Sequence, residues 1–410
     1  MGINSNGTTL IDGGKFDNIG AITWDTTAKT TGFTGVSGNG YFVNTTSGAI
    51  TVTLPSSPSA GDVIAISDYA NTADTNNITI GRNGSNIQGE ASDFIISTEG
   101  TSVLLIYVDG TKGWLLIDAA QASDIVAPKF VAATGGTITT VGDFKFHRFT
   151  GPGTFTVTCA GNASGSNTLD TVVVAGGAGG GFNAGGGGAG GLRSITSIPV
   201  TATGYPITVG GGGSGGTGPS RTGASGSNSV AALSTSYTSA GGGGGGTAGV
   251  NGGSGGGSGA RCDPHSGGAG NQPPVSPPQG NPGGAYNITS YSCQGSSGGG
   301  GASTAGTAKP QCGGAPGTAG GNGTDVSPNY PGQPNSGVYA GGGGGGACGA
   351  SGGTGGTGGP GGGGNGGGPP STGSAGTTNT GGGGGGGTSG SGGGGGNGGS
   401  GIVIIKYKFQ

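Results

Sequence analysis

The 410-residue chain has few charged residues and few of the side chains on which most active sites depend. Asp, Glu, Lys and Arg together make up 7% of it, against about 25% in ordinary soluble domains. It contains only two glutamates, Glu90 and Glu99, and two histidines, His147 and His265. A glycosidase needs two carboxyl groups flanking the sugar bond, and no stretch pairs them in this way. We therefore expect a protein that is not an enzyme and holds no cofactor and no metal.

Basic clusters and long apolar runs are also missing. The net charge is −3, and without a Lys or Arg cluster to neutralise phosphates we expect no nucleic-acid partner. The longest apolar stretches, VLLIYV at 103–108 and IVII at 402–405, fall short of the roughly 20 residues that cross a bilayer, so we expect no membrane insertion. The opening MGINSNGTTL has no basic region followed by an apolar one, so we expect no secretory signal.

Cysteine is scarce and its spacing excludes the common metal motifs. No two of the five cysteines have the C-x-x-C spacing of zinc ribbons and thioredoxin-like redox sites. Cys159 follows Phe155 and Val157 in an alternating pattern, which favours a buried free thiol. The other four lie in the glycine-rich region and are candidates for disulfides whose pairing stays open: Cys262, Cys293, Cys312 and Cys348.

The first part of the chain reads as short β-strands. AITVTLP alternates apolar and polar residues with the period of two that is typical of a half-buried strand, and similar segments follow about every ten residues. Asp109-Gly110 predicts a hairpin turn, because both residues tolerate positive φ. We predict an all-β module over 31–120, preceded by an attachment and oligomerisation segment over 1–30 and followed by a junction over 121–128.

A second β domain surrounds a glycine-rich insert. Strand patterns recur over 129–240, and the final GIVIIKYKFQ places Ile405, Tyr407 and Phe409 on one face. We therefore predict one β-sandwich-like domain formed by 129–240 plus 401–410, with 241–400 inserted into it. No stretch has a helical period, so the fold class is all-β without α-helices.

The glycine block is either a flexible linker or an ordered bundle of polyglycine-II helices. The chain holds 116 glycines, and composition alone favours the linker. However, the runs have similar lengths, and prolines and Asn-Gly steps lie between them where turns are needed. A helix of glycines with three residues per turn points its N–H and C=O groups sideways, where they can bond neighbouring helices. We therefore predict an ordered bundle.

Side chains that could recognise a partner lie in two segments of this block, 260–294 and 309–339. A tyrosine there either packs against the bundle or offers a flat amphipathic face to a sugar or protein. The candidate receptor-binding residues are Arg261, Asp263, His265, Tyr286, Tyr291, Tyr330 and Tyr339.

Two parts of the sequence resemble known phage proteins. Residues 40–117, with TVTLP, GD, NNITI, RNG and GW in that order, resemble a β module of tail fibres of tailed phages, notably those that infect cyanobacteria. TFTVTCAG, TVVVAGGAGGG and PITVGGGG, with the glycine runs that follow, resemble the glycine-rich C-terminal domain of phage fibres and the polyglycine tip adhesins of T-even phages. Unlike those adhesins, this chain carries its own β module in front and a strand after the block.

The resemblance implies a virion tail fibre, a homotrimer that binds other virion proteins through its N-terminus. The loops over 260–294 and 309–339 would bind a host-surface glycan or protein. The alternative is a purely structural surface fibre or decoration protein that binds no receptor. Two further readings, an ice-binding protein and a polysaccharide-cleaving enzyme, are less favoured by the residues.

Overall fold

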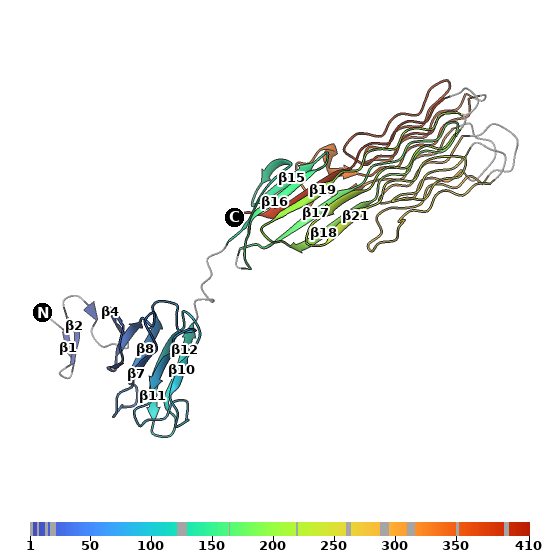
Figure 1. Ribbon diagram of the computed structural model, residues 1–410. Helices are drawn as coiled ribbons and strands as arrows, with labels where there is room; N and C mark the ends of the chain where they lie inside the picture. The colour runs from blue at the N-terminus through green and yellow to red at the C-terminus, as the bar shows by residue number, and fades with distance from the viewer. Residues whose placement is uncertain are drawn as a thin grey trace. The chain divides into compact units, whose positions relative to one another are not determined.

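A computed structural model describes most of the chain, as two compact units, Met1–Ala127 and Pro128–Gln410 (Figure 1). In the described part, regular structure is almost entirely β, with one short 3-10 turn at Asn335–Gly337, which confirms the all-β class. The described residues are 3–5, 8–12, 15–16, 22–120, 129–163, 165–218, 220–259, 264–287, 295–309, 316–349, 352–388 and 393–410.

The first unit contains a small antiparallel sheet and a larger two-sheet module. The five-stranded sheet has the order β12-β11-β8-β6-β4, and the four-stranded sheet has the order β10-β9-β7-β5. The small sheet consists of β1 (Ile3–Ser5), β2 (Thr8–Asp12) and β3 (Lys15–Phe16). The module consists of β4 (Thr23–Lys29), β5 (Phe33–Thr34), β6 (Asn39–Val43), β7 (Ile50–Thr53), β8 (Val63–Asp68), β9 (Ile78–Gly81), β10 (Phe94–Ile96), β11 (Ser102–Asp109) and β12 (Gly113–Ala120).

The chain winds through this module as a short parallel solenoid. β4, β6 and β8 pair in parallel in one sheet, and β5, β7 and β9 do so in the other, so successive strands alternate between the sheets. The predicted hairpin at Asp109-Gly110 joins β11 to β12, and the Asp109 carboxylate accepts hydrogen bonds from the N–H groups of Thr111 and Lys112. The predicted start at residue 31 is wrong, because β4 already belongs to the sheet and Trp24 stacks 4.8 Å from Phe42.

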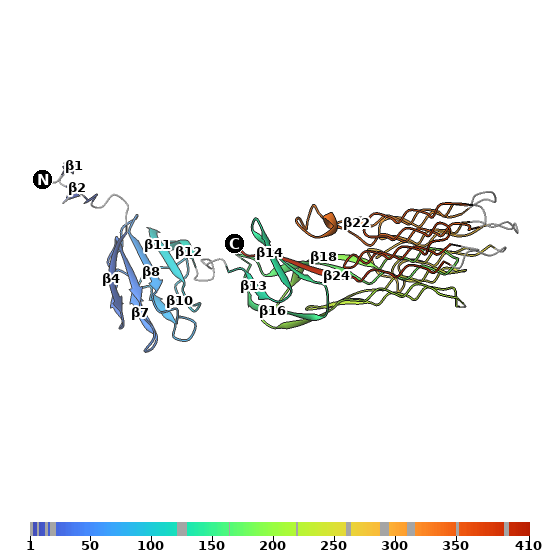
Figure 2. The ribbon, with the colours of Figure 1, turned by 90° about the horizontal axis from the view of Figure 1, so that it is seen from above.

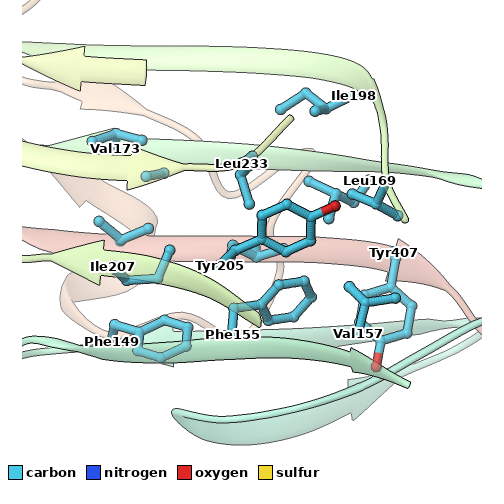
Figure 3. Close-up of a cluster of buried hydrophobic side chains, with 14 of the residues drawn as sticks. Phe149, Phe155, Val157, Leu169, Val173, Ile198, Tyr205, Ile207, Leu233 and Tyr407 are labelled. Atoms are coloured by element: carbon cyan, nitrogen blue, oxygen red, sulfur yellow. The ribbon is translucent and has the colours of Figure 1, made fainter. Parts of the chain in front are cut away.

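The second unit is built on a sandwich of two antiparallel five-stranded sheets, ordered β13-β16-β19-β20-β21 and β14-β15-β24-β17-β18. Alternating apolar residues of both sheets point inward, and Phe155, Tyr205, Val173 and Tyr407 meet in the core (Figure 3). The strands are β13 (Val131–Thr134), β14 (Thr137–Val141), β15 (Phe144–Phe149), β16 (Gly153–Ala160), β17 (Thr168–Val174), β18 (Leu192–Pro199), β19 (Gly204–Thr208), β20 (Ser229–Ala232), β21 (Ser236–Ser239) and β24 (Ile402–Lys408).

The last strand closes the sandwich around the glycine-rich insert. β24 lies between β15 and β17 and pairs antiparallel with both. His147 of β15 is fully buried there; its Nδ1 lies 2.7 Å from the Gly135 carbonyl oxygen and its Nε2 lies 3.0 Å from the Tyr407 hydroxyl. The carbonyl is only an acceptor, so Nδ1 carries the proton and Nε2 accepts from the hydroxyl.

The glycine runs continue directly from the strands of the sandwich (Figure 2). β17 ends at Val174 and the chain runs on through 175–181, whose Gly177 donates to the carbonyl of Gly399 at 2.9 Å. The predicted bundle boundary at residue 241 is therefore wrong, since 175–191, 209–218 and 220–228 already belong to the bundle. A strand can pass into a polyglycine helix without a turn because both backbones are extended.

Hydrogen bonds in the bundle repeat every three residues, as three residues per turn require. In the run 175–181, Ala175, Ala178 and Gly181 all donate to one neighbouring run. The residues one position later, Gly176 and Gly179, donate to a second run, and those two positions later, Gly177 and Gly180, donate to a third. The carbonyls of this run accept from three further runs, so it is bonded on every side. Its neighbours are 185–191, 223–228 and 393–401 as acceptors, and 210–216, 240–246 and 381–387 as donors.

Inner and outer runs differ in which residues must be glycine. The inner run 341–346 is buried at every position, and a Cβ at Gly343 would lie 2.1 Å from the carbonyl oxygen of Gly384. In the outer run 352–360 only every third residue, Gly353, Gly356 and Gly359, is buried, and threonines occupy exposed positions between them. The bundle is therefore an ordered, nearly side-chain-free solid, and its outer face tolerates small polar residues.

Candidate functional site

The turns of the bundle lie at two opposite ends, one beside the sandwich and one away from it (Figure 2). We call the second the far end. A run that leaves β17 at Ala175 reaches the far end at Gly181, where the Gly181 N–H donates to the Gly185 carbonyl and the next run returns to β18. The described residues of the far end include 182–184, 217–218, 220–222, 264–265, 286–287, 309, 348–349 and 388.

Two of the predicted site residues, His265 and Tyr286, come together at the far end. The N–H of His265 donates to the Tyr286 carbonyl at 2.7 Å, and the Tyr286 N–H donates back at 2.8 Å. A neighbouring segment of the same chain adds Lys309, whose N–H donates to the Ala285 carbonyl at 2.9 Å. These three residues form a small sheet-like cluster that we call the His-Tyr-Lys cluster. Arg261, Asp263 and Tyr291 lie outside the described residues.

The polar groups of the His-Tyr-Lys cluster are largely engaged or buried. Lys309 donates from Nζ to the Pro316 carbonyl at 2.9 Å, and burial lowers the pKa of its ammonium group. His265 Nε2 is buried and has no hydrogen-bond partner within the described part of the chain. Tyr286 is only 2% exposed, so its ring packs into the bundle and offers no flat face at the surface.

Two residues that the sequence argument missed lie at another corner of the far end. The N–H of Phe182 donates to the Arg221 carbonyl at 2.7 Å, and both side chains are partly exposed. Arg221 has a φ of 55°, a left-handed conformation suited to a tight turn. A signal was present, because Phe182-Asn183 interrupts a glycine run and PSR interrupts another, and each interruption marks a turn.

One of the four candidate cysteines can be assigned. Cys348, fully buried near the far end, is disulfide-bonded, and Cys159 in β16 is a free thiol. The partner of Cys348 is therefore one of the other three candidates. These are Cys262, Cys293 and Cys312, which lie outside the described residues. Covalent closure adds to the hydrogen bonds that hold this end together.

Tyr330 and Tyr339 lie at the opposite end of the bundle, against the sandwich. They belong to a segment that carries the short strands β22 (Thr324–Asp325) and β23 (Val338–Tyr339) and packs on the outer face of the sheet that contains β24. Tyr330 is 2% exposed and lies 6.2 Å from Phe146 between ring centroids, while Tyr339 is fully buried. Their predicted role as exposed receptor-binding rings is wrong, because apolar contact with the sandwich buries them.

Burial also sets the ionisation of these two phenols. It raises the pKa of Tyr330 well above its ordinary value and the pKa of Tyr339 to about 12. The Tyr339 hydroxyl donates to the Pro334 carbonyl at 2.8 Å, and the Lys406 ammonium lies 5.2 Å from the centroid of the Tyr330 ring. The segment 324–339 therefore holds its two tyrosines against the outer face of the sandwich, and we call this segment the tyrosine latch.

The described residues hold no group of three His, Cys, Asp or Glu side chains close enough to bind a metal ion. Across the same residues, no helix has the length and apolar character to span a membrane. The described side chains of the far end offer hydrogen bonding and apolar contact.

An all-β sandwich that extends into a polyglycine bundle is a scaffold that presents turns. Comparison with known families identifies residues 150–408 as a glycine-rich domain. The match spans more than half of the chain, so the protein belongs to this glycine-rich domain family. No curated protein matches the chain. The matched region runs from Thr150 to Lys408 and includes both strand-forming and glycine-rich parts, as the single compact unit Pro128–Gln410 does.

Proposed function

We propose that the protein is a virion tail fibre or adhesin that binds a host-surface glycan or protein through the turns at the far end. One observation carries the proposal: the turns stand on a bundle whose inner runs are hydrogen-bonded on every side. Loops held by a rigid scaffold lose little conformational entropy on binding. The resemblance of residues 40–117 and of the glycine-rich part to phage fibres supports the same role.

The proposal also covers assembly and location. The protein acts on the virion surface, as a homotrimer attached to other virion proteins through its N-terminal segment, and it is not an enzyme. Several copies on one particle would strengthen a weak individual contact, because each bound copy raises the effective concentration of the next. These statements rest on the resemblance.

The candidate residues for such binding are the partly exposed side chains of the far end. The far end retains Phe182, Arg221, His265 and Lys309 as partly exposed side chains, while the tyrosine latch is removed from the set. Deleting the whole of 260–339 would therefore be a poor test, because it would also uncover the outer face of the sandwich.

A sharper test uses labelled full-length protein and cells of a susceptible host. We expect the double variant Arg221→Ala/Lys309→Ala to lose binding at least tenfold, and Thr357→Ala, on the exposed flank of the bundle, to bind as the wild type does. Unfolding curves would check that all three chains are folded. If the wild type fails to bind any host that the virion infects, the purely structural fibre is the better description. If the double variant binds as well as Thr357→Ala does, Arg221 and Lys309 do not carry the binding, and the assignment of the site to these turns is overturned.

A further inference from the structure

The sandwich has a groove at the edge where its two sheets lie open. β18 is the last strand of one sheet and β21 is the last strand of the other, so among the described strands neither has a partner on this side. The groove has a volume of about 560 Å³, within the range of about 300–1,000 Å³ that is usual for sites of small ligands. The groove is lined by Arg193 to Thr196 of β18, by Tyr237 of β21 and by a proline-rich wall, Ser276 to Pro278.

The proline-rich wall is held in place by one buried amide. Gln279 is 1% exposed; its Oε1 accepts from the Ala240 N–H and its main-chain carbonyl accepts from the Leu192 N–H, both at 2.8 Å. Its Nε2 donates to the Pro273 carbonyl at 2.9 Å, which ties the turn to both sheets at once. The groove is therefore preformed, and a ligand would not have to order it.

Arg193 is a cation without an acidic partner in the described part of the chain. Its guanidinium donates one hydrogen bond, to the Thr238 carbonyl at 3.2 Å, and lies 5.9 Å from the centroid of the Tyr237 ring. Neither of the two ion pairs among the described residues involves it, and no Asp or Glu lines the groove. A guanidinium has five N–H donors, so several remain for the carboxylate of a ligand.

The other lining groups match the two faces of a sugar. Tyr237, Pro277 and Pro278 offer flat apolar surfaces on which the C–H face of a pyranose can lie. The hydroxyl of Ser276 can exchange hydrogen bonds with ring hydroxyls, because it both donates and accepts. Ser194 pairs with Val172 and lies on the other face of β18 from Arg193, since side chains alternate along a strand.

An extended peptide fits the groove less well. Strand addition uses a free backbone edge, and a typical strand has about five to six residues. The N–H of Leu192 is already bonded to Gln279, and Ser197 has a φ of 57°, which interrupts the extended backbone. Only Arg193 to Thr196 remain as a regular edge, which is short for a stable added strand.

We propose that this groove binds a short acidic saccharide, with Arg193 pairing with a sugar carboxylate and Tyr237, Pro277 and Pro278 holding the ring. The site lies beside the sandwich and not among the turns of the far end. It does not depend on the attachment function proposed above.

The test is calorimetric titration of the full-length protein with trigalacturonate and with its neutral methyl ester. We expect the acidic sugar to bind at least tenfold more tightly than the ester. Arg193→Gln should lower affinity for the acidic sugar at least tenfold and remove the preference, and Arg193→Lys should restore part of it. Lys112→Gln, which removes the same charge from an exposed position in the first unit, should bind as the wild type does.

A second variant separates binding from folding. Ser276→Trp would fill the groove from an exposed position in its proline-rich wall, and it should also abolish binding. The proposal is overturned if trigalacturonate does not bind at millimolar concentration, if the ester binds equally well, or if folded Arg193→Gln keeps full affinity. Protection of the β18 amides by an extended peptide, without any saccharide binding, would overturn it in favour of strand addition.

Discussion

Replacing one inner glycine by alanine should destabilise the bundle far more than the same change on its surface. A Cβ at Gly343 would lie 2.1 Å from the carbonyl oxygen of Gly384 and 3.2 Å from the nitrogen of Gly187, and both contacts are rigid backbone. Overpacking of this kind costs about 1–3 kcal/mol. Moving the run 341–346 away from 381–387 also weakens the bonds Gly383 to Gly341 and Gly386 to Gly344, at about 0.5–1.5 kcal/mol each. The expected loss for Gly343→Ala is therefore about 2–6 kcal/mol.

Gly211→Ala is the matched control. Gly211 is exposed, its φ is not positive, and a Cβ built there meets nothing within 4 Å. Alanine should stabilise this position by about 0.4–1 kcal/mol, because it reduces the freedom of the unfolded chain. Calorimetric unfolding, with amide exchange over 341–346 as a local measure, would compare the two variants. Equal melting temperatures and equal exchange would refute close backbone packing as the basis of this fold.

Three further predictions concern the sandwich and its attachments. Burial lowers the pKa of His147 in the folded protein, so below pH about 6.5, the ordinary pKa of the imidazole, the unfolded chain binds more protons than the folded one. The free energy of unfolding should therefore fall as the pH drops below about 6.5, and it should fall less in His147→Gln; urea unfolding at pH 7 and pH 5 measures both. Tyr339→Phe should cost about 0.5–1.5 kcal/mol through the bond to Pro334, but Tyr339→Ala about 3–5 kcal/mol; equal losses in urea titrations would contradict the buried ring. Reduction of the disulfide at Cys348 should lower the free energy of unfolding by about 2–4 kcal/mol, measured by comparing melts with and without dithiothreitol. If dithiothreitol destabilises Cys348→Ser by the same amount, the loss has another cause.

Local sequence patterns predicted the strands well and the turns only in part. The alternation in β7, the Asp109-Gly110 hairpin and the final strand each depend on residues close together in sequence, so they could be read directly. The start of the first module was placed too late, because the parallel pairing of β4 with β6 joins residues separated by a loop and leaves no hairpin signal. The bundle was likewise placed too late, since nothing in AGGAGGG marks the passage from strand to polyglycine helix.

The candidate site was harder to predict than the fold. His265 and Tyr286 were expected in one loop and do pair, but Tyr330 and Tyr339 were assigned to the same surface and lie at the other end of the bundle. Whether a turn lies at the far end or beside the sandwich depends on how many runs precede it in the chain. The sequence of a glycine run does not show toward which of these ends the run is directed. The tyrosines were misplaced for that reason.

The sequence by itself determined an all-β protein whose glycine runs are ordered and whose last strand returns to the sandwich. Strand alternation and run length decide these features locally. Only the tertiary structure decided which runs touch and which turns share an end. Ala178, for example, bonds both Gly188 and Gly384 through its main chain alone. Backbone hydrogen bonds between glycines leave no side-chain pattern that identifies the partner run, so the position of each run in the bundle is decided only when all the runs are packed together.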